Sequence, residues 1–585
     1  MLNRNVLYLL SRAWGLLCTV LCVSCGGGLG GDNQAPDTVV ASVPIAYVKH
    51  VIPQGDPGDT SRFMGADLRN PYEFHPGASL WLRDAASPSA AERNITAELF
   101  PVDPQTEAAP LYDVRDVSVA AVQGGLKLLF SAHAPTIEGA DQQPTWNIYI
   151  YDVETRTVTR MLKSDVVAEA GHDIQPQFLP NGDIIFASSR QHTAKARLLD
   201  EGKSQYNALD ENRGVEAAAL HVYTTQGELR QLTFNPSHDL YPHVLPDGRI
   251  LFVRWDNFGD RDGFNLYTIY PDGTGQNLAF AFRIALPLNA DTSISDTPSL
   301  AGRLQHLSPL GDGTGRFLVS WSPCRVLDPE VLAANSEAVS EAVSEGTASI
   351  RTLPCTESLL ANPDVVEADP LFSLWITDTD GINRLPLVLV EAGEMISEAI
   401  AVSDAMSPMS AVPDSTRDAA LQAAQLGVLD IRSVYDFDGQ DTTTLGITAL
   451  ADAAQTTVAD RPARFVRLEK TVPLPSDEVL RIENSAFGRS ATQLMREIIG
   501  YAPVEPDGSV RVVVPANVAF TLSVLDADGR RIGGRHQNWL QVQSGETLLC
   551  QGCHEANSEV PHGRRDALPR RRMRAPRQMG PFPIV

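Results

Sequence analysis

Five consecutive residues near the end of the chain, Cys550-Gln551-Gly552-Cys553-His554, have the types and the spacing that bind a prosthetic group. Two thiols separated by two residues and followed at once by a histidine form the C-x-x-C-H pattern of covalent haem attachment. Cys550 and Cys553 would bond the two vinyl groups on one edge of the porphyrin, and His554 would ligate the iron. We therefore predict one covalently bound haem c, with an ordinary pair of cysteines as the alternative.

The second axial ligand of this iron would decide its chemistry. A histidine or methionine at that position favours electron transfer, whereas an open position permits small-ligand chemistry. His562 lies eight residues after His554, in a segment short enough to fold over the ring, and His536 precedes the motif. Both are candidates, and histidines elsewhere in the chain, a methionine or water are the alternatives.

The N-terminus has the features of an export signal. Arg4 and Arg12 precede an apolar run at residues 13–23, which is too short to span a bilayer and is followed by Ser24 and Cys25. In this context Cys25 resembles the lipidated cysteine of bacterial lipoproteins. Cleavage without lipidation and an uncleaved anchor are the alternatives.

Export would place the chain in the periplasm, held to a membrane by a lipid on Cys25, and we favour the outer membrane. The boundaries that follow are a signal peptide at residues 1–25 and a flexible tether at residues 26–40, which are rich in Gly and Asp. An oxidising compartment also permits disulfides. We predict one between Cys324 and Cys355, with two separate buried thiols as the alternative.

The composition is that of a soluble globular protein with an acidic surplus. The chain has 585 residues, and its 72 acidic against 47 basic residues give a formal net charge of −25. This length exceeds what one hydrophobic core supports, so several domains are expected. Because nucleic acids are bound through basic surfaces, we exclude them as a general partner.

A recurring pattern organises residues 41–395. Residues 173–186 are echoed by residues 239–252, each copy having a strand, a Pro-Asn-Gly or Pro-Asp-Gly turn and a buried apolar strand. Weaker copies of the apolar strand lie at residues 45–48, 125–130 and 315–321. Repeats of this length built from four short strands are typical of β-propeller blades. We predict a mainly β fold with a six-bladed propeller, in which five blades are visible and the sixth draws on the stretch after Val390.

The rest of the chain lacks this repeat. Residues 396–480 are interpreted as a connecting region, with the option of completing the propeller. Strands and turns typical of a small antiparallel β-sandwich follow, and residues 481–564 are assigned to this sandwich with the haem motif. Residues 565–585 are rich in arginine and proline without a strand or helix period, which predicts a disordered basic tail. A basic interaction arm is the alternative.

Three further segments, taken with the repeats and the haem motif, resemble a known family. They are Ser-Ala-Phe-Gly-Arg-Ser at residues 485–490, the sandwich segment at residues 500–509, and Arg-His-Gln-Asn-Trp-Leu at residues 535–540. Over roughly residues 110–564 the chain is similar to the α-subunit of hydrazine synthase and its wider relatives. The resemblance implies a periplasmic multidomain cytochrome with a central six-bladed propeller and a C-terminal haem domain. That α-subunit carries two c-type haems, one beside a zinc site, whereas this chain has a single C-x-x-C-H, so only the architecture and one haem are carried over.

Three functional hypotheses follow. The first is a lipid-anchored c-type haem protein that exchanges electrons with a redox partner protein. The second is a binding or scaffolding propeller without a redox role, and the third is a haem enzyme that acts on a small nitrogen compound. Whether the chain is an enzyme stays open, and no catalytic residue is assigned.

Overall fold

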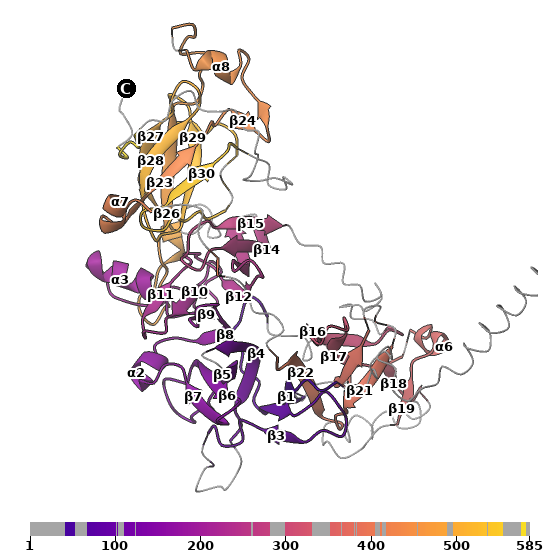
Figure 1. The fold of residues 1–585 in the computed structure, drawn as a ribbon. Helices are drawn as coiled ribbons and strands as arrows, with labels where there is room; N and C mark the ends of the chain where they lie inside the picture. The colour runs from indigo at the N-terminus through magenta and orange to yellow at the C-terminus, as the bar shows by residue number, and fades with distance from the viewer. Residues whose placement is uncertain are drawn as a thin grey trace, which may run out of the picture.

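The fold is built almost entirely from short antiparallel β-strands (Figure 1). It is a computed structural model, and most of the chain between residues 41 and 580 is described. The described residues are 41–52, 67–100, 102, 110–122, 125–258, 261–280, 299–329, 351–363, 365–378, 381, 383–403, 410–411, 417–452, 454–487, 495–534, 536, 538–553 and 575–580.

Five four-stranded antiparallel sheets have the strand order of propeller blades. In the order of hydrogen-bonded neighbours they are β22 (Glu394–Ala401), β1 (Ile45–Val51), β2 (Ala78–Arg83) and β3 (Glu92–Asn94); β4 (Asp113–Val122), β5 (Gly125–His133), β6 (Trp146–Asp152) and β7 (Thr157–Arg160); β8 (Asp173–Phe178), β9 (Ile184–Ser188), β10 (Ala219–Tyr223) and β11 (Leu229–Gln231); β12 (Asp239–Val244), β13 (Ile250–Phe258), β14 (Arg261–Ile269) and β15 (Asn277–Phe280); and β16 (Arg303–Pro309), β17 (Phe317–Ser322), β20 (Ser373–Thr377) and β21 (Arg384–Val388). Contacts of β12 with β8, β8 with β4, β4 with β22 and β22 with β16 place the sheets side by side in that order. The mainly β fold with blade-like sheets is confirmed.

The predicted Pro-Asn-Gly and Pro-Asp-Gly turns join the first two strands in two of these sheets. Gly182 and Gly248 have φ values of 85° and 79°, a left-handed conformation that glycine adopts readily because it lacks a Cβ. Strand β9 is buried along its whole length. Sheets on both of its faces explain this burial and therefore its unbroken apolar run.

The first strands of neighbouring sheets are linked at a repeated β-bulge. Asp116, Gln175 and Tyr241 occupy the bulges of β4, β8 and β12 with φ of 60°, 58° and 50°. The backbone N–H of Tyr241 donates to Oε1 of Gln175 (2.7 Å), and that of Gln175 donates to Oδ2 of Asp116 (3.0 Å). The N–H of Asp116 in turn donates to Oε1 of Glu398 on β22 (3.0 Å). Each bulge therefore ties its sheet to the next one.

The stretch after Val390 does not build a sixth blade. It forms β22, which pairs antiparallel with β1 and places Ala401 opposite Ile45. The strand thereby completes the first sheet, whose inner edge would otherwise expose unpaired backbone groups. Among the described residues five four-stranded sheets are present, so the sixth predicted blade is not found where the sequence analysis placed it.

Smaller elements decorate this part of the chain. Strands β18 (Arg325–Leu327) and β19 (Thr352–Pro354) pair with each other. A disulfide joins Cys324 and Cys355 beside them, with the Cα atoms 5.4 Å apart. The helices here are α2 (Asp165–Ala168), α3 (His192–Asp200) and α6 (Glu357–Leu360).

The remaining long strands form a β-sandwich of two three-stranded sheets. The sheets are β28 (Val510–Pro515), β23 (Leu426–Ile431) and β30 (Thr547–Cys550), and β27 (Arg496–Pro503), β26 (Phe465–Thr471) and β29 (Phe520–Leu525). Their facing side chains, among them Leu429, Val466 and Phe520, make one buried core. Around the sandwich lie the hairpin β24 (Asp436–Phe437) and β25 (Gln440–Asp441), the helices α7 (Ala419–Ala423) and α8 (Ile447–Leu450), and the 3₁₀ helix η2 (Asn484–Phe487).

The sandwich begins earlier in the chain than the sequence analysis placed it. Strands β23 and β26 lie within the predicted connecting region, residues 396–480, yet they are the central strands of the two sandwich sheets. Their partners β28 and β29 come more than 50 residues later. Pairing over such a separation leaves no local pattern that a single sequence reveals.

Part of the predicted disordered tail, residues 565–585, is ordered. Within it, residues 575–580 lie along the open edges of both sandwich sheets. The N–H of Arg577 donates to the carbonyl of Arg511 on β28 (2.9 Å), and a second pair of backbone hydrogen bonds joins the segment to β27. Met579 packs against the core. The edge strands of the two sheets offer unpaired backbone groups, and residues 575–580 are held in place by binding to them. Composition alone does not predict this pairing.

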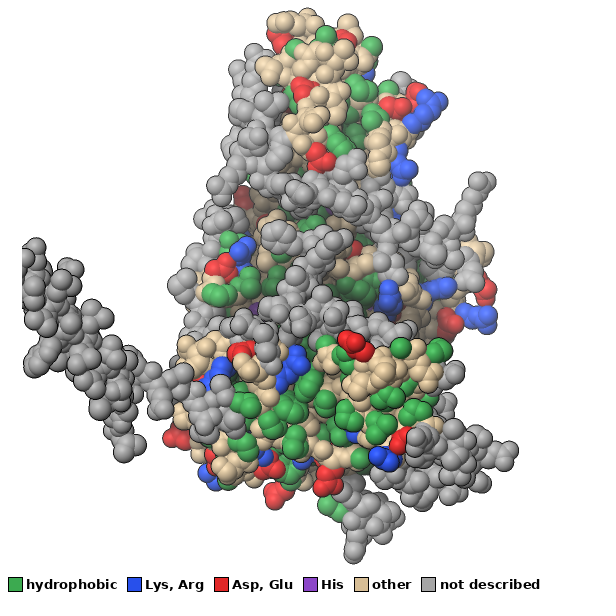
Figure 2. Space-filling view, turned by 90° about the vertical axis from the view of Figure 1, so that its right-hand side faces the viewer, with side chains coloured by type: hydrophobic (Ala, Val, Ile, Leu, Met, Phe, Trp, Pro, Cys, Tyr) green, Lys and Arg blue, Asp and Glu red, His purple; other side chains and the backbone are tan. Residues whose placement is uncertain are grey.

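The surface of the described part is mixed. No helix in the described ranges is long and apolar enough to cross a membrane. Figure 2 views the side of the molecule on which β24 lies, and there hydrophobic side chains gather most broadly on the lower, propeller part. Side chains of both charges lie among them, so the acidic surplus is not concentrated on the described part of this face.

Candidate cofactor site

The cysteine pair of the motif is held between the sandwich and the β24–β25 hairpin. Cys550 ends β30, which runs parallel to β23 and places Cys550 beside Ile431. The carbonyl of Cys550 accepts a hydrogen bond from the N–H of Arg432 (2.8 Å). Cys553 lies across the hairpin, where its N–H donates to the carbonyl of Asp436 (2.8 Å) and its own carbonyl accepts from the N–H of Asp438 (2.9 Å). Backbone hydrogen bonds therefore hold the main chain of both cysteines in place.

The turn between the two cysteines depends on a glycine. A Cβ on Gly552 would lie 2.6 Å from the carbonyl oxygen of Asp436. This distance is shorter than van der Waals contact, so only glycine lets the turn approach the hairpin so closely. The turn lies at a cavity that Cys550, Gly552 and Cys553 all line.

Neither cysteine of the motif is in a disulfide. Burial raises the pKa of the Cys550 thiol to about 12, and the neighbouring Cys553 adds to this shift. Burial, with a smaller contribution from Asp436, raises the pKa of Cys553 to about 11. Both thiols are therefore protonated at neutral pH. Reactive redox cysteines have lowered pKa values, so this environment disfavours a thiol–disulfide exchange site.

Cys550 and Cys553 both line a cavity of about 770 Å³. Such a volume is within the range of small-molecule and cofactor sites, roughly 300–1,000 Å³. Its walls come from β23, the β24–β25 hairpin, the following loop, β29 and the segment before Trp539. The lining residues are Leu278, Ile431, Val434, Tyr435, Phe437, Thr442, Thr443, Thr444, Leu445, Ala459, Asp460, Pro462, Ala463, Leu522, Val524, Ile532, Gly533, Gly534, His536, Asn538, Cys550, Gly552 and Cys553.

Apolar side chains at this cavity are exposed to solvent. Phe437, Leu445 and Ile532 are 37%, 50% and 36% exposed. Single exposed apolar side chains are normal on a protein surface, whereas several gathered around one cavity are typical of a binding site. The walls thus suit a largely apolar group better than an ionic ligand.

His536 shares the cavity with Cys550 and Cys553. Its backbone is held at the edge of β29, where its carbonyl accepts a hydrogen bond from the hydroxyl of Thr521 (3.0 Å). Its Nδ1 lies 2.8 Å from the carbonyl of Asn538. Because a carbonyl only accepts, Nδ1 carries a proton in this contact. Metal-binding histidines commonly hold one ring nitrogen in such a hydrogen bond and ligate through the other.

Several predicted site residues lie outside the described residues. These are His554, His562 and Cys25. Of the two candidates for the second axial ligand, the structure places His536 at the cavity. Among the described residues no group of three or more His, Cys, Asp or Glu side chains could hold a metal ion.

The segment after His536 also docks the sandwich onto the propeller. Trp539 is 2% exposed, and its Nε1–H donates to Oε1 of Glu211 (3.2 Å). Arg254, which is fully buried and paired with Asp239 at 2.8 Å, donates to the carbonyl of Trp539 (3.3 Å). The tryptophan is therefore a domain-interface residue and does not line the cavity.

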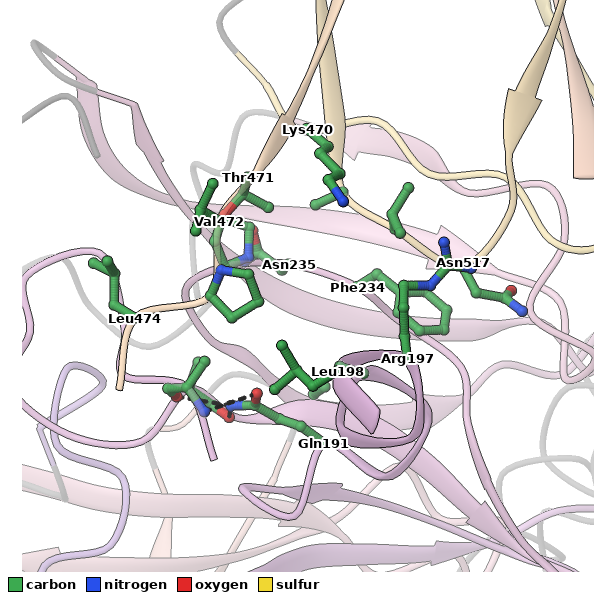
Figure 3. Close-up of a pocket in the computed structure, with 18 of the residues that line it drawn as sticks. Gln191, Arg197, Leu198, Phe234, Asn235, Lys470, Thr471, Val472, Leu474 and Asn517 are labelled. Carbon is green, nitrogen blue, oxygen red and sulfur yellow. Dashed lines mark hydrogen bonds between the residues drawn. The ribbon is translucent and has the colours of Figure 1, made fainter. Parts of the chain in front are cut away.

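A second, smaller cavity lies at this domain interface (Figure 3). Its volume is about 100 Å³, and it is lined by Arg197 from the propeller and by Lys470 and Asn517 from the sandwich. Arg197 donates to the carbonyl of Ala516 (2.6 Å), and Lys470 pairs with Glu201 (3.1 Å). None of the residues predicted from the sequence lines it.

The sequence analysis missed much of the cavity wall. Residues between Val434 and Ala463 contribute about half of it, yet they lie in the segment interpreted as a connection. Their only local signal is the Asp-Phe-Asp-Gly turn at residues 436–439, where Asp438 and Gly439 have positive φ. That turn marks the hairpin but not its position over the cysteines.

Comparisons with known proteins find a family match over this part of the chain. Residues 442–555 match the family described as hydrazine synthase alpha subunit middle domain. The match includes Cys550, Cys553 and His536 together with most of the cavity wall. It confirms the resemblance that the sequence analysis found. A comparison with curated proteins finds no match.

Solved structures extend the likeness to the whole fold. Hydrazine synthase of Kuenenia stuttgartiensis aligns with 90% of this chain and 72% of its own, at 14% identity and a TM-score of 0.53. At this identity the match establishes the shared fold. The tricorn protease (12% identity, TM-score 0.19, 53% and 29% of the two chains) and dipeptidyl peptidase 4 of Porphyromonas gingivalis (10%, 0.21, 54% and 44%) also align.

The residues that line this cavity fit a covalently bound haem. Both cysteines line a largely apolar cavity of suitable volume, and a histidine whose Nδ1 is hydrogen-bonded to a backbone carbonyl lines it as well. A haem bound there would supply an iron that changes oxidation state or binds a small ligand. Cys550 and Cys553 would hold the ring, and His536 is placed to ligate or contact it.

Proposed function

We propose that this chain is an exported, lipid-anchored c-type haem protein that transfers electrons to or from a partner protein. The carrying observation is that both cysteines of the C-x-x-C-H motif line the same largely apolar cavity as His536. The N-terminal sequence supports export and lipidation at Cys25, and the periplasm with the outer membrane is the compartment in which we place the protein. His554 would be the first iron ligand, as its place in the motif indicates.

The proposal is tested by expression of the full chain with haem-maturation factors. We expect the mature protein to carry the added mass of one haem, to stain for haem after denaturation and to show a c-type absorbance spectrum. The Cys550→Ala/Cys553→Ala double variant should lose all three signals. A wild-type protein without covalent haem would refute the proposal and favour the binding or scaffolding propeller.

A second candidate function is a haem enzyme acting on a small nitrogen compound. The observation that favours it is the solvent-exposed apolar rim of the cavity, which would admit a small molecule to an open iron position. Spectra of the reduced protein with and without nitric oxide separate the two functions. An electron carrier with two axial ligands gives a low-spin spectrum that nitric oxide changes little, whereas an open site gives a nitrosyl spectrum at once.

The same spectra identify the second ligand. If His536 ligates the iron, His536→Ala converts a low-spin spectrum to a high-spin one while covalent haem is retained. An unchanged spectrum would transfer the role to His562 or another group.

A further inference from the structure

A chain of hydrogen bonds runs from the cavity into the propeller. Asn538 lines the cavity, and its Nδ2 donates to the hydroxyl of Tyr267 on β14 (2.9 Å). The hydroxyl of Tyr267 donates onward to Oδ2 of Asp256 on β13 (2.9 Å). The chain thus crosses from the sandwich to a carboxyl group that belongs to the other domain.

The Asp256 carboxyl is buried and only partly hydrogen-bonded. The residue is 5% exposed, and Oδ2 also accepts from Nδ2 of Asn265 (2.8 Å). Its Oδ1 is buried without a hydrogen-bond partner among the described residues. An unpartnered buried carboxylate oxygen is costly, whereas a proton on the group removes the charge.

Among the side chains that the structure describes, the charged and titratable groups that interact with Asp256 are Arg254, Asp239, Tyr267 and Glu211. Burial raises the pKa of Asp256 to about 6, the nearby Arg254 guanidinium opposes this shift, and Asp239 adds to it. Arg254 is paired with Asp239 at 2.8 Å, so its charge is largely matched by that carboxylate. Glu211 carries a further buried carboxyl whose pKa burial raises to about 8, so it is mostly protonated at neutral pH.

We propose that Asp256 is a redox-linked protonation group for the cofactor cavity, coupled to it through Tyr267 and Asn538. The proposal rests on the proposed function and deepens it, since it names the residue that links electron transfer to proton uptake. If a one-electron donor reduced a haem bound in the cavity, the added negative charge would favour uptake of one proton from solvent by the Asp256 carboxylate. On oxidation the electron would pass to the acceptor and the proton would return to solvent.

The sign of the effect follows from electrostatics. An oxidised haem in the cavity would carry one more positive charge than a reduced haem, so it would favour the ionised form of Asp256. A reduced haem would favour the protonated form. The midpoint potential therefore falls as pH rises through the range between the two pKa values of Asp256. A full one-proton coupling is a tenfold change in the reduction equilibrium per pH unit, which is about 59 mV for one electron.

The test is a potentiometric titration of the haem-loaded full chain from about pH 5 to about pH 8, a range that brackets the pKa of Asp256. We expect the wild-type midpoint potential to fall with pH, by up to about 59 mV per unit, and Asp256→Asn to remove most of the fall. Tyr267→Phe removes the hydroxyl that joins Asn538 to Asp256, so it should reduce the fall, and the part that remains should lie at higher pH because loss of the hydroxyl donor raises the Asp256 pKa. A wild-type profile in Tyr267→Phe would contradict the proposed link. This second variant keeps the test decisive if Asp256→Asn does not fold.

Asp113→Asn is the matched control. Asp113 is a similarly buried carboxyl, 1% exposed, whose pKa burial raises to about 7, and it lies on β4 away from the cavity lining. Its variant should keep the wild-type pH profile. A flat profile in haem-loaded wild type, or a slope that persists in Asp256→Asn, overturns this proposal and leaves the proposed function standing. A chain that carries no covalent haem overturns both.

Discussion

At the scale of single residues, the domain interface depends on a carboxyl group kept neutral by its surroundings. Glu211 is 9% exposed and accepts hydrogen bonds from Trp539 and from the hydroxyl of Ser237 (3.1 Å). Burial raises its pKa from 4.5 to about 8. Both neighbours donate hydrogen bonds that a neutral carboxyl also accepts, so the interface does not need a charge on Glu211.

This environment predicts a pH-dependent stability. Because the folded-state pKa of Glu211 is raised, its stabilising contribution is complete below about pH 4.5 and is lost as pH rises through about 8. Each pKa unit corresponds to about 1.36 kcal/mol, so we expect a difference of a few kcal/mol. Glu211→Gln should flatten this part of the pH profile of the free energy of unfolding, measured by chemical denaturation. Parallel profiles for wild type and variant would show that the carboxyl ionises without cost.

At the scale of elements, the site depends on how β30 and the β24–β25 hairpin meet. Strand β30 supplies Cys550, and the hairpin holds Cys553 through two backbone hydrogen bonds. The turn between them has room for a hydrogen atom but not for a methyl group at Gly552. Cofactor attachment is therefore sensitive to the spacing of two elements that lie more than 100 residues apart in the chain.

Gly552→Ala should disturb this meeting point. Its Cβ would lie 2.6 Å from the Asp436 carbonyl oxygen, so the turn or the hairpin must move. We expect a loss of about 1–3 kcal/mol in the free energy of unfolding and a lower fraction of haem-loaded protein in the mass spectrum. Gly534→Ala is the control, since Gly534 also lines the cavity but has no atom within 4 Å of an added Cβ. Equal loading in both variants would contradict the role of the close approach.

At the scale of the whole molecule, the propeller and the sandwich share a buried polar interface. Trp539 inserts between the domains, and Arg254 binds its carbonyl from within the propeller. Other contacts extend the interface, including those of Gln541 with the backbone of Phe234 (2.8 Å) and Leu232 (3.1 Å). We infer that the segment from His536 to Gln541 joins cavity and propeller into one unit.

Trp539→Ala should weaken the interface between the propeller and the sandwich. Loss of a buried tryptophan costs about 3–5 kcal/mol, and we expect denaturant unfolding to separate into two transitions. Trp539→Phe is the matched control because it keeps an aromatic ring but loses the hydrogen bond to Glu211, with an expected loss of about 1–2 kcal/mol. A single transition at the wild-type midpoint in Trp539→Ala would contradict the docking role.

The sequence by itself determined the features that rest on short-range patterns. The hairpins at residues 173–186 and 239–252 were readable because a Pro-Asn-Gly or Pro-Asp-Gly turn and a buried apolar strand are local signals. The thiol pair was singled out because its residue types and spacing carry its chemistry. No diagnostic spacing pointed to His536, which was one of two candidates. The likeness to the hydrazine synthase α-subunit also rested on short segments.

Tertiary structure decided the rest. Strand β22 closes the first sheet, β23 and β26 form the centres of the sandwich, and residues 575–580 cover its edges, all through pairing between distant segments. The cavity wall between Val434 and Ala463 and the link from Asn538 to Asp256 likewise join residues that are far apart in the chain. Such contacts depend on which strand edges and buried groups remain unsatisfied once the local elements have formed, and this is a property of the assembled fold.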